Sequence, residues 1–184
     1  MFVITIIVVL LLLVVAVLLF RRNHIPRRIW TFWDSEEVPE FIQKCIQTWR
    51  DKNTNYEIVV LGPHNLQKYL SHYEIFKLQS WKYNDCPQKF SDLVRLSVLS
   101  KYGGIWLDAS IVCYENFDWV HDENADCLLY SIPELSPKEK PLIESWFIAC
   151  TPNNDYVKRW RDEFMHVEKY NSIDDYVSDV NIDM

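Results

Sequence analysis

Residues 89–110 read KFSDLVRLSVLSKYGGIWLDAS, and this stretch decides the fold class. The segment Pro87–Tyr102 carries apolar residues on most sides, which predicts a largely buried helix. Gly103 ends it, because adjacent glycines give the backbone unusual freedom and the chain has only 3 glycines. Ile105–Leu107 then predicts a short strand that runs into Asp108. Ligands of open α/β sheets bind at the carboxyl ends of strands, so Asp108 stands where a ligand would lie.

The segment that precedes this stretch predicts a parallel β-α-β unit. Arg28–Trp33 (RIWTFW) and Tyr56–Leu61 (YEIVVL) are rich in residues that favour strands. Between them, apolar residues recur at helical spacing from Pro39 onward. A strand, a helix and a second strand in succession predict a parallel sheet and an α/β fold. Further strands are expected at Cys127–Ser131 and Trp146–Cys150, with a helix at Asn154–His166; Ile75–Cys86 is undecided.

Two charged residues of the buried helix are candidates for a binding site. Asp92 and Arg95 are three residues apart and therefore share one helix face. Because buried charges must be paired or must meet a ligand, they form either an intrahelical ion pair or part of a site. Asp108 could accept a sugar or ribose hydroxyl or hold a divalent cation with a diphosphate; the alternative is a turn aspartate. Trp33, at its strand's end, either stacks on a nucleobase or packs in the core.

The N-terminus predicts a membrane anchor. Phe2–Phe20 is apolar except for Thr5, and as a helix it would span about 28 Å, close to the hydrocarbon thickness. The segment lacks the basic start and the cleavage site of a signal peptide, so we expect an uncleaved single-pass helix. A buried core helix is the alternative. The four arginines that follow it place the domain on the cytoplasmic side by the positive-inside rule; luminal, Golgi-type placement is the alternative.

Composition narrows the function classes. The chain is 49% hydrophobic and 15% aromatic, which indicates a globular domain, and its net charge of −7 disfavours a nucleic-acid-binding protein. The 5 cysteines are odd in number and lack CxxC spacing, which disfavours a zinc site and a disulfide framework, although one pair is left open. Cys45 and Cys150 are expected to be buried thiols. The histidines show no metal-ligand spacing.

Three motifs together carry a family resemblance. The order I-P-x-x-I-W-x-x-W, S-D-L-V-R and Y-G-G-I-W-L-D-A-S resembles the capsular polysaccharide synthesis proteins. It also resembles a wider set of glycosyltransferases with a DXD sugar-binding region, which includes yeast-type α-mannosyltransferases and is similar to the large clostridial glucosylating toxins. The likeness covers residues 25–115 well and the rest loosely. It implies a GT-A fold (a Rossmann-like nucleotide-diphospho-sugar transferase domain), a nucleotide-diphosphate-sugar donor and Mn²⁺ or Mg²⁺.

The resemblance also implies residue roles. Trp33 matches the tryptophan that stacks on the base, and Asp92 and Arg95 match the pair that holds the donor sugar and the diphosphate region. Asp108 matches the first aspartate of the DXD motif. The implied donor-binding set is Trp33, Asp92, Arg95, Trp106 and Asp108; the catalytic candidates are Asp92, Arg95 and Asp108; the metal candidates are Asp108 and Ser110. Trp146 lies near the acceptor by its position in the family.

The chain departs from the family pattern in two ways. The DXD motif is Asp108-Ala109-Ser110, and the second aspartate of the family usually carries the direct metal contact. The hydroxyl of Ser110 is neutral, so metal binding should be weaker or completed from elsewhere. The chain is also short, which suggests a truncated reading frame. The aspartates of the acidic tail could substitute as ligands, but a solvated tail is the favoured interpretation of Asp174, Asp175, Asp179 and Asp183.

The expected organisation is an anchor at 1–20, a basic stem at 21–24, a GT-A domain at 25–170 and an acidic tail at 171–184. The expected function is transfer of a hexose from a UDP- or GDP-sugar to a glycan or lipid-linked acceptor at a membrane, with retention of configuration implied by the family. A catalytically degenerate binding or scaffold protein of the same fold is the main alternative. An anchored structural protein is disfavoured by the co-occurrence of the three motifs.

Overall fold

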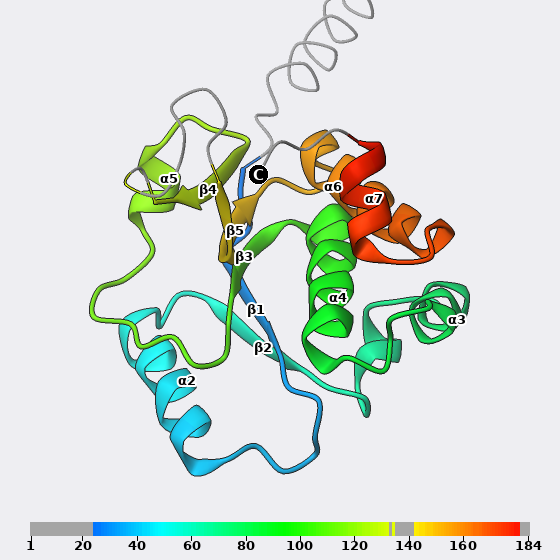
Figure 1. Cartoon of the computed structure of the whole chain (residues 1–184). Helices are drawn as coiled ribbons and strands as arrows, with labels where there is room; N and C mark the ends of the chain where they lie inside the picture. Colours follow the sequence, from blue (N-terminus) through cyan, green and yellow to red (C-terminus); the bar gives the residue numbers. More distant parts are fainter. Residues whose placement is uncertain (1–23, 133, 135–141, 181–184) are drawn as a thin grey trace, which may run out of the picture.

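A computed structural model describes residues 24–132, 134 and 142–180. A five-stranded sheet of order β2-β1-β3-β5-β4 forms its centre, with helices on both faces (Figure 1). The strands are β1 Arg28–Phe32, β2 Glu57–Leu61, β3 Gly104–Leu107, β4 Cys127–Ser131 and β5 Ile143–Cys150. The helices are α2 Glu40–Lys52, α3 His72–Ser80, α4 Pro87–Tyr102, α5 Trp119–Asp122, α6 Asp155–His166 and α7 Ile173–Asp179, with 3₁₀ turns η1 Leu66–Lys68 and η2 Val167–Lys169. The anchor expected at 1–20 lies outside the described residues, among which no helix is long and apolar enough to cross a membrane.

The strand pairing confirms the expected α/β fold and the parallel β-α-β unit. Strand β1 pairs in parallel with β2 on one side and with β3 on the other. Strand β5 then runs antiparallel to β3 and to β4. It begins at Ile143, three residues before the predicted start. The carboxyl ends of β1, β2 and β3 therefore share one edge of the sheet, and the chain of β5 enters at that same edge.

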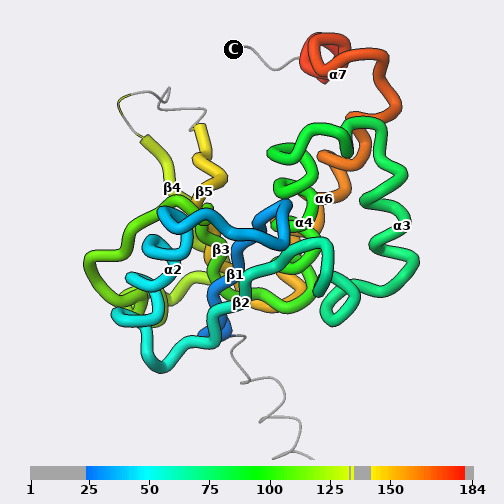
Figure 2. The backbone as a smooth tube through the Cα atoms, turned by 90° about the horizontal axis from the view of Figure 1, so that it is seen from below, coloured from blue at the N-terminus to red at the C-terminus, as the bar shows by residue number. Residues whose placement is uncertain are grey.

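Alternation along β1 sends side chains into two separate cores. Trp30 and Phe32 pack on one face of the sheet with residues of α4 and α6. Ile29 packs on the other face with Trp49 of α2. Figure 2 shows the same division, with α2 on one side of the strands and α4 and α6 on the other. Full burial of such side chains stabilises the fold by roughly 1.5–3 kcal/mol each, so both sheet faces are firmly covered.

The glycine pair connects α4 directly to β3. Gly103 and Gly104 have φ angles of 62° and 101°, which side-chain-bearing residues rarely adopt. A Cβ on Gly103 would lie 2.6 Å from the carbonyl oxygen of Cys150, and one on Gly104 would lie 2.7 Å from that of Arg28. The indole nitrogen of Trp30 donates to the Gly103 oxygen at 2.8 Å. Only glycines let the chain leave α4 and enter the sheet between its neighbours.

Helices α3 and α7 were not predicted from the sequence. Helix α3 begins before the undecided region Ile75–Cys86 and runs into it, and its start is fixed by a capping box between Ser71 and Glu74. The stretch after Lys169 was expected to be an open acidic tail, but it contains α7, which Ser172 caps through the backbone N–H of Asp175. The Tyr176 hydroxyl donates to Glu163 of α6 at 3.0 Å, so this helix is attached to the domain.

All five cysteines lie in the described part of the chain and are free thiols there. Cys45 and Cys150 are 2% and 0% exposed, which confirms that both are buried. Burial raises the pKa of the Cys113 and Cys127 thiols to about 11 in each case.

Candidate functional site

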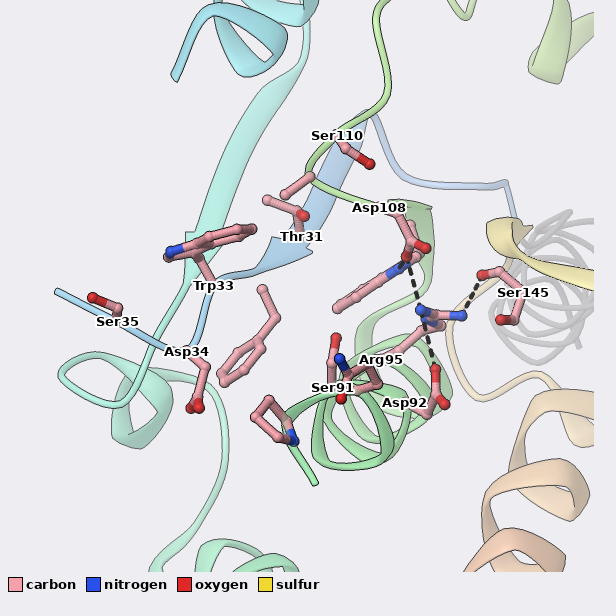
Figure 3. A pocket seen from close by; sticks show the side chains of 15 residues that line it. Thr31, Trp33, Asp34, Ser35, Ser91, Asp92, Arg95, Asp108, Ser110 and Ser145 are labelled. Atoms are coloured by element: carbon pink, nitrogen blue, oxygen red, sulfur yellow. Dashed lines mark hydrogen bonds and ion pairs between the residues drawn. The ribbon is translucent and has the colours of Figure 1, made fainter. Parts of the chain in front are cut away.

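A cavity of about 570 Å³ lies at the carboxyl edge of β1 and β3. Its walls are the end of β1 with the turn that follows (residues 31–35), the first turns of α4, Trp106 of β3 with residues 108–110 after that strand, and Ser145 of β5 (Figure 3). The six residues predicted to bind the donor or the metal all line this cavity: Trp33, Asp92, Arg95, Trp106, Asp108 and Ser110. Trp146, which was expected near the acceptor, does not line it. The structure therefore brings together residues that are up to 77 positions apart in the chain, from Trp33 to Ser110.

Arg95 is the centre of the charged wall. Its side chain is 5% exposed, and its Nη2 lies 2.8 Å from Oδ1 of Asp108 and 3.1 Å from Oδ1 of Asp92. Its Nη1 donates to the backbone oxygen of Ser145 in β5. The guanidinium carbon lies 4.9 Å from the ring centroid of Trp106. The intrahelical ion pair and the site are thus not alternatives, since Arg95 is shared by the helix partner and the strand-end carboxylate.

Burial dominates the electrostatics of this wall. It raises the pKa of the Asp92 carboxyl; the positive charge of Arg95 opposes that rise and the negative charge of Asp108 adds to it. Burial also lowers the pKa of the Arg95 guanidinium, against the effect of the two carboxylates. One positive charge thus faces two negative ones in a poorly solvated place. The wall can accept a further cation or hydrogen-bond donors such as sugar hydroxyls.

Asp108 is held at one oxygen and open at the other. Its Oδ1 accepts hydrogen bonds from Arg95 and, at 2.9 Å, from the indole nitrogen of Trp106. Its Oδ2 has no hydrogen-bond partner among the described residues, and the side chain is 40% exposed. The ring of Trp106 is 1% exposed, so this residue fixes the orientation of Asp108 from within the cavity wall. Asp108 therefore presents one oriented, free oxygen to whatever enters.

Asp108 and Ser110 were the expected metal ligands. Among residues 24–132, 134 and 142–180, no group of three or more His, Cys, Asp or Glu side chains could hold a metal. The cavity nevertheless offers the free carboxylate oxygen of Asp108 and the hydroxyl of Ser110. Mg²⁺ is commonly bound through one or two carboxylates together with substrate phosphates and water. These residues thus fit a metal that arrives with a diphosphate, rather than a site formed by protein ligands alone.

Trp33 forms the opposite wall. Its backbone N–H donates to the Leu61 oxygen at 2.9 Å, which extends the pairing of β1 and β2 by one residue. The half-buried indole therefore has a fixed base, and Figure 3 shows it across the cavity from Asp108 and Arg95. An aromatic face on one side and a charged wall on the other suit a ligand with a flat ring and a polar part.

Among the cavity residues that the sequence did not single out, Ser145 and Thr31 matter for polar bonding. Ser145 contributes the backbone oxygen that binds Arg95. Thr31 is 0% exposed, and its hydroxyl has no hydrogen-bond partner among the described residues. The alternation of β1, which places Thr31 on the same side as Trp33, was the available signal for Thr31. No local signal existed for Ser145, because its position depends on a distant strand returning beside β3.

A comparison with protein families shows to which family the chain belongs. Residues 17–181 match the family model described as "Capsular polysaccharide synthesis protein". The chain belongs to this family. The match confirms the likeness predicted from the tryptophan, the Asp92/Arg95 helix and the glycine turn, and it extends that likeness past the well-matched segment 25–115.

Curated relatives point the same way. The chain is 27% identical over 163 residues to the O-glycosyltransferase braB of Annulohypoxylon truncatum, with 75% of this chain and 37% of the relative covered. It is 23% identical over 154 residues to the glycosyltransferase afumC of Aspergillus fumigatus, with 75% and 39% covered. It is 31% identical over 97 residues to inositol phosphoceramide mannosyltransferase 3 of Schizosaccharomyces pombe, with 51% and 26% covered. The chain thus spans less than two-fifths of the length of these relatives.

Solved structures show the fold. The structure titled "PaToxG Glycosyltransferase" superposes with a TM-score of 0.60 at 17% identity, covering 79% of this chain and 62% of that one. The UDP-bound glycosyltransferase domain from the YGT toxin superposes with a TM-score of 0.54 at 11% identity, covering 88% and 65%. The expected GT-A-like α/β architecture is confirmed at the level of the fold.

Proposed function

We propose that this chain is a glycosyltransferase that moves a hexose from a nucleotide-diphosphate sugar to a glycan or lipid-linked acceptor. One observation carries the proposal: Arg95 is fixed between Asp92 and Asp108 on a cavity wall that faces Trp33. The flat base of a nucleotide-diphosphate sugar suits Trp33, its hydroxyls suit the two carboxylates, and its anionic diphosphate would enter with the cation that this wall can accept. Family membership and the named activities of the relatives support the same reaction class.

Each cavity residue has a defined task in the proposed reaction. Trp33 stacks on the nucleobase, a contact that is worth about 1–3 kcal/mol per base on aromatic side chains. Asp92 and Asp108 accept hydrogen bonds from hydroxyls of the sugar or ribose, and Arg95 keeps the two carboxylates in place. A Mg²⁺ or Mn²⁺ ion held by Asp108 and Ser110 would offset the negative charge of the leaving diphosphate.

Membrane attachment is part of the proposal. The apolar segment 1–20 would hold the domain at a bilayer, where a lipid-linked acceptor is found, and the arginines after it favour the cytoplasmic side. Retention of the donor's configuration is proposed with it, as the family resemblance implies. A protease-protection assay on sealed vesicles would report the orientation, because a luminal domain would resist digestion until the vesicles are opened.

A catalytically degenerate binding protein is the second candidate. The observation that favours it is Ser110, which supplies a neutral hydroxyl where the DXD pattern has a second carboxylate. Such a protein would keep the fold but would have lost the working donor and metal site. Calorimetry separates the two candidates, because a scaffold without donor function should bind neither nucleotide sugar nor Mn²⁺.

The decisive experiment is transfer and donor hydrolysis by the full chain in detergent, with a panel of UDP- and GDP-sugars, with and without Mn²⁺. Asp108→Ala should reduce turnover on the order of 100-fold, since it removes an oriented group at the site of charge development. Asp118→Ala is the matched control, because Asp118 is an exposed carboxylate paired with Arg27 outside the cavity. Undiminished transfer by Asp108→Ala would show that the site is assigned wrongly.

A further inference from the structure

We propose that the Thr31 hydroxyl binds the nucleoside of the donor, so that Thr31 is a binding residue beside Trp33. The inference rests on the proposed function and adds a residue that neither the motifs nor the family match indicates. Thr31 lies in β1, lines the cavity and is 0% exposed. Its Oγ1 has no hydrogen-bond partner among the described residues. Figure 3 shows its side chain between Trp33 and Ser110.

An unpaired buried hydroxyl is costly, so its position needs an explanation. Buried polar side-chain atoms in native structures nearly always have a partner, and those without one merit a specific reason. The neighbours of Thr31 in β1 are Ile29, Trp30 and Phe32, all buried and apolar. Valine has the same shape as threonine and favours strands equally well, so β1 would fold with valine at this position. A ligand that supplies the missing partner accounts for the hydroxyl.

The distribution of unpaired groups supports a ligand in the cavity. Four buried side-chain atoms lack a partner within the described part of the chain, and two of them, Thr31 Oγ1 and Arg95 Nε, belong to residues that line the cavity. The other two belong to Trp81 and Tyr83, whose rings contact one another outside the cavity. Of the two cavity atoms, the Thr31 hydroxyl lies two residues before Trp33, which directly follows β1, and extended backbone places both side chains on the same side. A nucleoside whose base stacks on Trp33 would place its polar atoms on the side of the strand where the Thr31 hydroxyl lies.

Thr48 provides a matched control in the same domain. Its Oγ1 donates to the Cys45 oxygen at 2.6 Å and accepts from the Cys113 backbone nitrogen at 2.9 Å. It does not line the cavity. The two threonines therefore differ in the property that matters, because one hydroxyl is fully used inside the protein and the other is not.

The experiment compares Thr31→Val with Thr48→Val in the full chain. Thr31→Val should raise the melting temperature by about 2–4 °C, because a buried unpaired hydroxyl disappears without loss of volume. The same change should weaken binding of UDP or GDP, whichever the wild type prefers, by about 5–10-fold in calorimetry with Mg²⁺ present. Thr31→Ser should retain the affinity. Thr48→Val should lower the melting temperature and leave nucleotide affinity unchanged.

Three results would overturn the inference. Equal nucleotide affinity of Thr31→Val and wild type would show that the hydroxyl contacts no ligand, while leaving the proposed function intact. A lower melting temperature of Thr31→Val would show that the hydroxyl serves the fold. Failure of the wild type to bind either nucleotide would remove this inference together with the proposed function. Should Thr31→Val not fold, the affinity ratio of Thr31→Ala to Thr31→Ser provides the same comparison.

Discussion

The buried polar groups at the two ends of the sheet differ in whether their hydrogen bonds are satisfied within the protein. At the amino end, Asn53, Tyr56, Phe117 and His121 form a closed set of hydrogen bonds, which we call the amino-end network. The Asn53 side chain donates to the Trp49 oxygen at 3.0 Å and accepts from the Phe117 nitrogen at 2.8 Å. The Tyr56 hydroxyl lies 2.9 Å from both the Phe117 oxygen and His121 Nε2. At the carboxyl end, the cavity leaves Thr31, Arg95 and one oxygen of Asp108 with unused bonding capacity.

This difference separates a region that holds the fold from one that awaits a ligand. A buried polar group with partners contributes to stability, whereas one without partners costs about 1–3 kcal/mol until something binds it. The amino-end network ties the end of α2 to the segment before α5, and its bonds are complete without any ligand. The cavity instead contains buried polar atoms without a partner among the described residues, Thr31 Oγ1 and Arg95 Nε. Changes in the network should therefore affect stability alone, and changes in the cavity should affect ligand binding.

The largest effect is expected for Arg95→Met. Arg95 both stabilises the fold and belongs to the ligand-binding cavity, so this change should affect stability and binding together. The change leaves the largely buried Asp92 without its positive partner, and loss of one member of a buried pair costs about 3–5 kcal/mol. Donor binding should be lost as well. Urea unfolding and calorimetry measure the two effects. Arg50→Met is the control, since Arg50 of α2 is exposed and lies outside the cavity; a wild-type stability for Arg95→Met would refute the assigned pairing.

The second prediction concerns the amino-end network. Asn53→Ala should lower the free energy of unfolding by about 2–3 kcal/mol, because it removes two buried hydrogen bonds and leaves the Phe117 N–H without its acceptor. Nucleotide affinity of the folded fraction should remain that of the wild type. Calorimetry at a temperature well below the melting midpoint tests the second statement, and a loss of affinity there would show that the two ends of the sheet are coupled.

The residues of the cavity could be predicted from the sequence better than those of the amino-end network. The pairing of Asp92 with Arg95 follows from helix periodicity, and the position of Asp108 follows from the general placement of ligands at strand ends. The role of Ser145 depends on how β5 returns beside β3, which no local pattern encodes, whereas the alternation of β1 could have indicated Thr31. The network is likewise built from residues more than 60 positions apart, such as Asn53 and Phe117. The capping box that begins α3 was local, but nearby apolar spacing was too irregular to fix the helix.

The third prediction concerns how the stability contributed by Tyr56 of the amino-end network changes with pH. Burial raises the pKa of the Tyr56 hydroxyl to about 12, above the ordinary value of 10. The unfolded chain therefore loses this proton at lower pH than the folded one, so the stabilisation is complete below pH 10 and is lost as the pH rises towards 12. Tyr56→Phe should cost about 1 kcal/mol at neutral pH and reduce the alkaline loss. Tyr176 titrates in the same range, so the test is the difference between wild type and Tyr56→Phe in melting temperature across pH 9–12.

The smallest effect is expected for Asp92→Asn. Because burial raises the pKa of Asp92 in the folded state, the protonated form is favoured there. The associated stability is complete below the unfolded pKa of about 3.9 and declines as the pH rises through the folded value. The amide cannot ionise, so Asp92→Asn should melt at a less pH-dependent temperature between pH 4 and 7 than the wild type.

The groups that face Asp92 explain why this effect is small and why it concerns the cavity. Burial raises the pKa of the Asp92 carboxyl and Asp108 adds to the rise, whereas Arg95 opposes it, so the effects on Asp92 partly cancel. The amide oxygen introduced by Asp92→Asn can still accept a hydrogen bond from Arg95. It is neutral, however, and is therefore a weaker acceptor for a sugar hydroxyl than the carboxylate. We therefore expect a modest change in stability together with a clear loss of donor affinity. The reverse pattern, a large loss of stability with unchanged affinity, would place Asp92 with the amino-end network as a residue of the fold.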